Sequence, residues 1–255
     1  MSCATYYTGD TFIHRLDPRP KVVATLAFSV LVALTSHSGV LIAGLISGAF
    51  LVILARISSD ALLKRLLRLN IFMLLLFVLV PLTFPGEPLF AVGALSYSYE
   101  GLIWSVIVTL KANAIVLVFA ALMGTVDPFV LGHAFHHLKV PEKLTHLFLF
   151  TLRYIDVLHH EYMALIRAMK TRGFVPSMRI HTYRSYAYLT GMLIVRSLER
   201  SERVMEAMKC RGYDGEFHVV SHFRFEKRDA IFLLITSLAL VILSVAVYTN
   251  RGRLW

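Results

Sequence analysis

Two short segments of the chain repeat the same residue types at the same spacing. "RAMKTRGF" ends at Phe174, and "EAMKCRGY" ends at Tyr213, 39 residues later. The shared pattern Ala-Met-Lys-x-Arg-Gly-aromatic predicts a helix that stops at the glycine, with an arginine beside its last turn. A guanidinium on a rigid helix end suits two-point hydrogen bonding to a carboxylate of another protein. The aromatic residue that follows suits apolar burial in the same contact.

A plainer explanation is that each arginine caps its own helix, because the end of a helix carries a partial negative charge. The duplication favours docking to a partner instead. The candidate docking residues are Ala168, Met169, Arg172, Gly173 and Phe174 in the first segment, and Ala207, Met208, Arg211, Gly212 and Tyr213 in the second.

A histidine-rich segment raises the question of a metal site. His133, His136 and His137 lie in "HAFHHL", and histidines at i and i+4 of a helix have metal-ligand spacing. We favour a solvated amphipathic stretch and predict no metal site, no catalytic residue and no cofactor. The alternative is an integral-membrane metalloenzyme that uses this segment. No GxxxxGK[ST] phosphate loop occurs, so the sequence does not predict ATP binding through that loop.

The composition indicates a membrane protein. The 255 residues are 57% hydrophobic and only 16% charged, with a formal net charge of +10. A soluble domain is usually about 45–50% apolar and about 25% charged. Long apolar runs combined with basic loops are typical of membrane proteins and are not what binding to phosphate groups requires, so we expect a lipid bilayer and no nucleic acid as partner.

Five apolar runs predict an all-α integral membrane protein with about five transmembrane helices. The runs cover residues 22–36, 39–55, 70–84, 102–124 and 230–248. The first and third are shorter than the usual 17–25 residues or so, and must tilt or extend into their flanks. Lys111 and Asn113 lie within the fourth run, where polar groups are costly, so we expect an internal hydrogen bond or a polar interface.

Three segments follow from these runs: a transmembrane bundle at 1–124, a helical region at 125–229 with both Arg-Gly tips, and a last span with a short tail at 230–255. In the middle region, a stripe from Leu144 to Met169 predicts one long amphipathic helix that ends at Gly173. Basic residues before the first run and between the second and third place the N-terminus and the middle region in the cytoplasm. Residues 251–253, "RGR", fit this orientation poorly.

The paired tips, the opening "HRLDPRPKVV" and the stretch "RSLERSERVMEAMKCRGY" resemble the transmembrane coupling subunit, or T component, of energy-coupling-factor importers, most of all the cobalt/nickel-type CbiQ subunit. This resemblance extends over nearly the whole chain. The family tip usually reads Ala-Arg-Gly, whereas Thr171 and Cys210 stand here in place of alanine.

The resemblance implies a non-catalytic subunit of the bacterial cytoplasmic (inner) membrane. Two cytoplasmic coupling helices would dock their ends into two ATPase subunits, which do the ATP hydrolysis. Their movement would reach a small membrane subunit that captures the substrate. Cobalt or nickel is the substrate that the resemblance favours, and a vitamin is the alternative.

Overall fold

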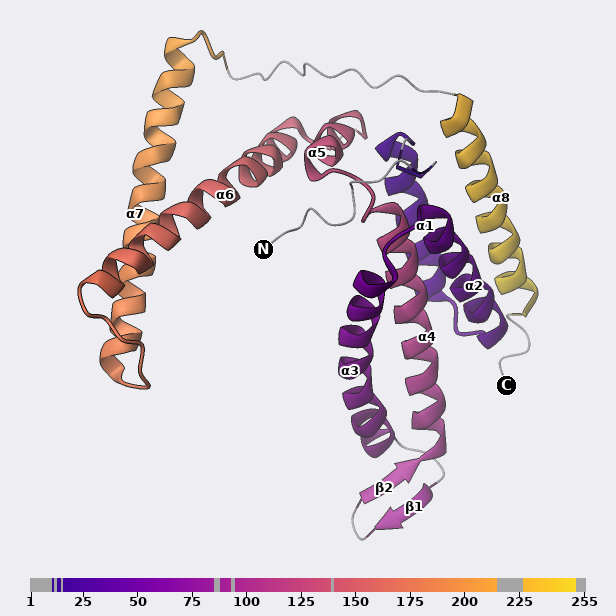
Figure 1. The fold of residues 1–255 in the computed structure, drawn as a ribbon. Helices are drawn as coiled ribbons and strands as arrows, with labels where there is room; N and C mark the ends of the chain where they lie inside the picture. The colour runs from indigo at the N-terminus through magenta and orange to yellow at the C-terminus, as the bar shows by residue number, and fades with distance from the viewer. Residues whose placement is uncertain are drawn as a thin grey trace. The chain divides into compact units, whose positions relative to one another are not determined.

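The computed structural model describes residues 11, 13–14, 16–84, 88–92, 95–138, 140–214 and 227–250. The chain divides into two compact units (Figure 1). Unit 1 comprises Met1–Leu131 with Phe223–Trp255, and unit 2 comprises Gly132–His222. Each unit has its own packing and is described separately.

Unit 1 is a helical bundle with one small β-hairpin. Its helices are α1 (Pro18–Leu34), α2 (Ser38–Ala55), α3 (Ser59–Thr83), α4 (Tyr99–Leu122) and α8 (Lys227–Asn250). The antiparallel strands β1 (Pro88–Val92) and β2 (Leu95–Ser98) form the hairpin between α3 and α4. The predicted all-α membrane architecture is confirmed, and the hairpin is an addition within a segment expected to be a loop.

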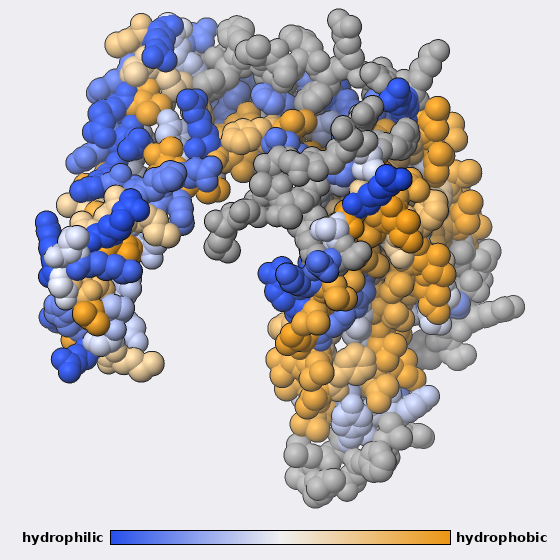
Figure 2. All heavy atoms as spheres, in the orientation of Figure 1, coloured by the Kyte–Doolittle hydropathy of each residue, from blue (hydrophilic) through white to orange (hydrophobic). Residues whose placement is uncertain are grey.

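Four of the described helical segments are long and apolar enough to cross a membrane. They are Ser38–Ala55, Leu62–Thr83, Tyr99–Leu122 and Arg228–Val245. The sequence predicted five spans, but α1 has only 17 residues and is not among the four. Many large apolar side chains on α3 and α8 are exposed, and Figure 2 shows hydrophobic residues across the visible face of these helices. Such surfaces suit lipid, because a soluble protein rarely leaves wide apolar patches open to water.

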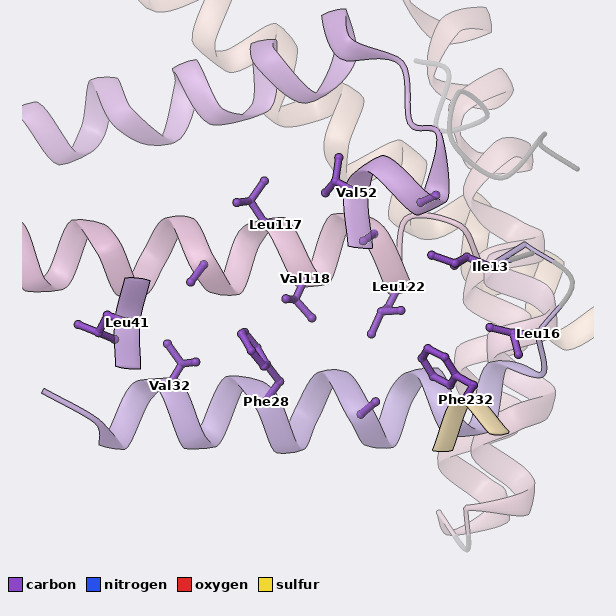
Figure 3. Packing of buried hydrophobic residues seen from close by; sticks show 14 residues of the cluster. Ile13, Leu16, Phe28, Val32, Leu41, Val52, Leu117, Val118, Leu122 and Phe232 are labelled. Atoms are coloured by element: carbon purple, nitrogen blue, oxygen red, sulfur yellow. The ribbon is translucent and has the colours of Figure 1, made fainter. Parts of the chain in front are cut away.

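The core of unit 1 forms around α4 (Figure 3). Leu117, Val118 and Leu122 of α4 pack in one cluster with Phe28 of α1 and Val52 of α2. Small residues permit the close approach of the helices. A Cβ added to Gly48 would lie 3.1 Å from Leu117 Cβ, and one added to Gly101 would lie 2.6 Å from Pro81 Cα.

Two partly buried polar residues of α4 make hydrogen bonds to neighbouring helices. Lys111 Nζ donates to the carbonyl oxygen of Ala33, in the last turn of α1, at 2.9 Å. Asn113 Nδ2 donates to Asn70 Oδ1 of α3 at 3.0 Å. These contacts agree with the internal hydrogen bonds that we expected for the two residues, because an unpaired polar group in hydrocarbon is costly.

A charged cluster joins the start of α1 to the start of α8. Asp17 caps α1 by accepting a hydrogen bond from the Arg19 N–H at 3.0 Å, as the "DPRP" sequence favours. The Asp17 N–H donates to Asp229 Oδ1 at 2.8 Å. Lys21, with only 1% of its surface exposed, lies near both carboxylates, so the first and last helices of unit 1 meet through buried charges.

Unit 2 contains most of α5 (Pro128–His137) and all of α6 (Glu142–Thr171) and α7 (Ile180–Cys210). Helix α6 begins directly after Pro141 and ends at the predicted tip, and Figure 2 shows mainly hydrophilic residues over α6 and α7. At its N-terminal end, Phe148 packs edge-on against Phe135 of α5, with ring centroids 5.5 Å apart. Helix α7 is one continuous helix that ends at the second predicted tip.

Candidate functional site

The first candidate tip is the C-terminal end of α6. Gly173 has a φ of +81°, in the left-handed region that favours glycine. Its N–H donates to the Lys170 carbonyl at 3.0 Å, and the Phe174 N–H donates to the Met169 carbonyl at 3.1 Å. This pair of bonds is the Schellman motif, which satisfies carbonyls at the helix end. Arg172, directly before the glycine, occupies the cap position.

The second tip, at the end of α7, has the same geometry. Gly212 has a φ of +84°, and its N–H donates to the Lys209 carbonyl at 3.0 Å. The Tyr213 N–H donates to the Met208 carbonyl at 3.1 Å. The sequence repeat is therefore also a structural repeat, in which equivalent residues form equivalent hydrogen bonds.

Both guanidinium groups are available to a partner. Arg172 and Arg211 are exposed, and neither guanidinium forms a hydrogen bond or ion pair with the part of the chain that the structure describes. Their side chains therefore do not bond to the carbonyls of their own helix ends. Ala168 and Ala207 are also exposed, whereas Met169 and Met208 are partly buried.

The two aromatic residues of the tips, Phe174 and Tyr213, are less exposed than the two arginines. The Phe174 ring packs edge-on against Tyr186 of α7, with centroids 5.7 Å apart, and Tyr213 lines a groove between α6 and α7. Both rings are partly buried within the chain. The aromatic rings therefore contact α6 or α7, and the arginines are the more exposed part of each tip.

The residues that replace the usual alanine fit their positions without strain. Thr171 Oγ1 donates to the Ala168 carbonyl at 2.9 Å, within its own helix, and Cys210 is exposed with a free thiol. Neither residue alters the hydrogen bonds of its tip.

One ion pair links α6 and α7 in the described part of the chain. Arg196 Nη1 donates to Glu161 Oε1 where the helices cross. The sequence pattern placed Glu161 on the solvent-facing side of α6, so this pairing was not predicted. The only signal in the sequence was that α7 carries charges complementary to Glu161. Periodicity could not show which of these charges lies opposite Glu161, because Arg196 is 35 positions away in the chain.

The histidine segment does not assemble a metal site in the described residues. Among the side chains that the structure describes, no group of three or more His, Cys, Asp or Glu is placed to hold a metal ion. His133 Nδ1 is buried, and the His136 side chain lies outside the described residues. His159 and His160 are exposed on α6.

Comparisons with known proteins agree with the resemblance. The family model of CbiQ, described as a cobalt transport protein, matches residues 9–220. An energy-coupling factor transporter transmembrane protein EcfT from Acidaminococcus fermentans is 29% identical over 228 residues, which cover 84% of each chain. EcfT from Staphylococcus aureus is 27% identical over 260 residues and 96% of each chain. An uncharacterised protein of Methanocaldococcus jannaschii is 26% identical over 251 residues, which cover 95% of this chain and 84% of that one.

These matches confirm the expectation of a non-catalytic subunit of a transporter in a membrane. The match to the family model extends from before α1 to beyond the second tip, so it includes most of both units but not α8. The chain belongs to the CbiQ family of transport proteins, as its resemblance to the T components of energy-coupling-factor transporters predicted.

Proposed function

We propose that this chain couples ATP hydrolysis by two partner ATPase subunits to uptake through a substrate-capturing membrane subunit. The observation that carries the proposal is the pair of Arg-Gly tips, which share one backbone geometry and present two exposed guanidinium groups that bond to none of the described residues. Two equivalent tips suit two equivalent partners. The names of the EcfT relatives, as transmembrane proteins of energy-coupling factor transporters, support the same assembly.

The tips are proposed to lie in the cytoplasm, with residues 125–229 acting as the coupling region between the spans of 1–124 and 230–255. Basic residues at the start of α1, and in the stretch from Arg56 through the first turns of α3, support this orientation. Each guanidinium would bind a carboxylate in a groove of one ATPase. The tips would remain bound in the open and the closed ATPase pair while α6 and α7 change their angle, and only a difference in binding free energy between the two states would shift their equilibrium.

The docking role predicts the effect of charge reversal at the tips. We expect Arg172→Glu and Arg211→Glu each to weaken co-purification of the ATPases from membranes, and the double variant to abolish uptake, because each change sets a carboxylate against a carboxylate. Arg153→Glu is the matched control, since Arg153 is exposed on α6 but lies away from the tip. Normal assembly and uptake in the double variant would refute docking through the tips.

For the substrate, we propose a divalent transition metal, cobalt or nickel, captured by the partner membrane subunit in the bacterial inner membrane. The description of the matching family as cobalt transport protein supports this proposal. Uptake of radioactive cobalt and nickel, measured in cells that express the whole complex and in cells whose chain carries Arg172→Glu and Arg211→Glu, tests it. Uptake of a vitamin in place of either metal would overturn the metal and leave the coupling role intact.

A further inference from the structure

Helices α6 and α7 touch over a short stretch, and the Glu161–Arg196 ion pair lies within it. The Glu161 side chain is 24% exposed and that of Arg196 45% exposed, so water screens the pair only in part. Arg196 contributes one of its forked nitrogens, and the bond is charge-assisted. The contact is therefore directional, unlike the apolar contacts beside it.

Open grooves flank this stretch. One groove of about 250 Å³ is lined by charged residues, including Glu161, Arg196 and Arg203. A second groove of about 450 Å³ is mainly apolar and lies between residues such as Phe150 of α6 and Val204 of α7. Leu158, Ser197 and Arg200 line both grooves, so the two spaces meet at the crossing. The grooves leave open space on both sides of the crossing, into which a change in the angle between the helices could move side chains.

The distance from the crossing to each tip determines how far that tip moves when the angle between the helices changes. At about 1.5 Å per residue, Arg172 lies about 16 Å along α6 from Glu161, and Arg211 lies about 22 Å along α7 from Arg196. A rotation of about 10° at the crossing would move the end of the longer arm by about 4 Å. Sliding one helix by a turn, about 5.4 Å, would break the ion pair, whereas a small rotation about the pair would keep it.

We propose that Glu161 and Arg196 are positioning residues, which fix the point where α6 and α7 cross and let the angle vary about that point. The ion pair acts as a pivot that prevents sliding, so that a change in the separation of the two tips becomes a rotation of one helix against the other. This inference rests on the proposed function, because it supposes that partners move the tips, but the pivot itself can be measured without any partner.

The test measures the distance between the tips in the full-length chain in lipid nanodiscs. Thr171 and Cys210 are exposed, occupy equivalent places in the two tips and belong to neither partner of the ion pair. Spin labels are attached at Cys210 and at Thr171→Cys, and Cys3→Ser removes the other thiol. Pulsed electron paramagnetic resonance then gives the distribution of distances between the two labels. The variants are Glu161→Arg, Arg196→Glu and the double exchange, with Arg184→Glu, an exposed arginine of α7 outside both grooves, as matched control.

Each single reversal is expected to increase the share of molecules outside the wild-type distance peak by roughly two- to fivefold, as for the loss of one partly exposed ion pair. The double exchange should restore the peak, and the control should leave it unchanged. Glu161→Gln, which keeps a hydrogen-bond acceptor and is gentler on folding, should give a smaller increase. An unchanged distribution in either single reversal, or a double exchange as broad as the singles, would overturn the pivot.

The same variants separate this inference from the docking role. In the complete transporter, single reversals are expected to keep the ATPases bound but to lower the amount of substrate taken up per ATP hydrolysed, with recovery in the double exchange. Loss of ATPase binding in the single reversals, with an unchanged distance distribution, would overturn the pivot. Failure of the tip variants Arg172→Glu and Arg211→Glu to affect ATPase binding would overturn docking alone, since the distance measurement involves no ATPase.

Discussion

Gly173 and Gly212 hold the same left-handed backbone conformation, with φ of +81° and +84°, at the ends of two different helices. The Cβ of an alanine at either position would meet no atom within 4 Å, so a lack of space does not explain why glycine is needed there. The requirement comes from the backbone, because a Cβ in the left-handed region approaches the following carbonyl oxygen. Glycine therefore allows the backbone conformation in which the chain leaves each helix.

Replacing a tip glycine should disturb the tip and leave the helix intact. We expect Gly173→Ala and Gly212→Ala each to cost about 1–2 kcal/mol at the tip and to weaken co-purification of the ATPases. Gly191→Ala is the control, since a Cβ there also meets no atom within 4 Å but Gly191 lies in the interior of α7. That change should stabilise α7 by about 0.5–1 kcal/mol and leave binding unchanged. Equal ATPase binding by all three variants would contradict a role for the tip backbone.

Close packing between α3 and α4 depends on Gly101. A Cβ at this position would lie 2.6 Å from Pro81 Cα and 3.1 Å from Phe84 Cβ, and the backbone atom of Pro81 cannot rotate away. We expect Gly101→Ala to lower the free energy of unfolding by about 1–3 kcal/mol, measured by denaturant titration in mixed micelles. Gly44→Ala is the matched control, because its Cβ would lie 3.5 Å from Phe28 Cζ, an ordinary contact. Similar losses in the two variants would argue against the crowding at Pro81.

Periodicity and end signals in the sequence were enough to predict the long helix α6 and the ends of α6 and α7 at the two glycines. The prolines and glycines at the ends of α1, α6 and α7 act through their own backbone conformation, so their effect is local and can be predicted from the sequence. The hairpin between α3 and α4 was missed, because a short loop with few polar residues can pair with itself without any change in periodicity. The first apolar run was placed at residues 22–36, whereas α1 begins four residues earlier, at Pro18, and ends at Leu34.

In the candidate site too, local features of the backbone could be predicted from the sequence, and contacts between helices could not. The helix ends at Gly173 and Gly212 follow from a local pattern that is written twice, whereas the docking role of the tip residues stays a prediction. The pairing of Glu161 with Arg196, and the packing of Phe174 on Tyr186, depend on how α6 crosses α7. A crossing angle is set by many weak contacts between side chains, and no local pattern encodes it.

The Asn70–Asn113 hydrogen bond should stabilise the contact between α3 and α4 in the membrane. Asn113→Leu removes the donor and leaves the Asn70 amide without this partner, so we expect a loss of about 0.6–1.7 kcal/mol in the free energy of unfolding. Asn70→Leu should cost a similar amount, although Asn113 keeps its bond to the Thr109 carbonyl. The double variant should cost less than the sum, because neither amide is then left unpaired. Strictly additive losses would show that the two amides do not interact.

Lys21 should make stability depend on pH in the alkaline range. Burial lowers the pKa of Lys21 to about 8, although the nearby carboxylates of Asp229 and Asp17 act to raise it. The unfolded chain releases the same proton near pH 10.4 or so, the ordinary value for lysine. Between about pH 8 and pH 10 the unfolded state therefore binds more protons, and the free energy of unfolding rises with pH by at most about 1.4 kcal/mol per pH unit from this group.

Removing the Lys21 amine should abolish this rise. We expect the melting temperature of the wild-type chain in detergent to increase relative to that of Lys21→Met between about pH 8 and pH 10, and the difference between them to stay constant below about pH 8, where both states hold the proton. Lys143→Met, which removes an exposed lysine of α6, should follow the wild-type curve. A parallel pH dependence in wild type and Lys21→Met would mean that the buried amine near Asp17 and Asp229 keeps its ordinary proton affinity.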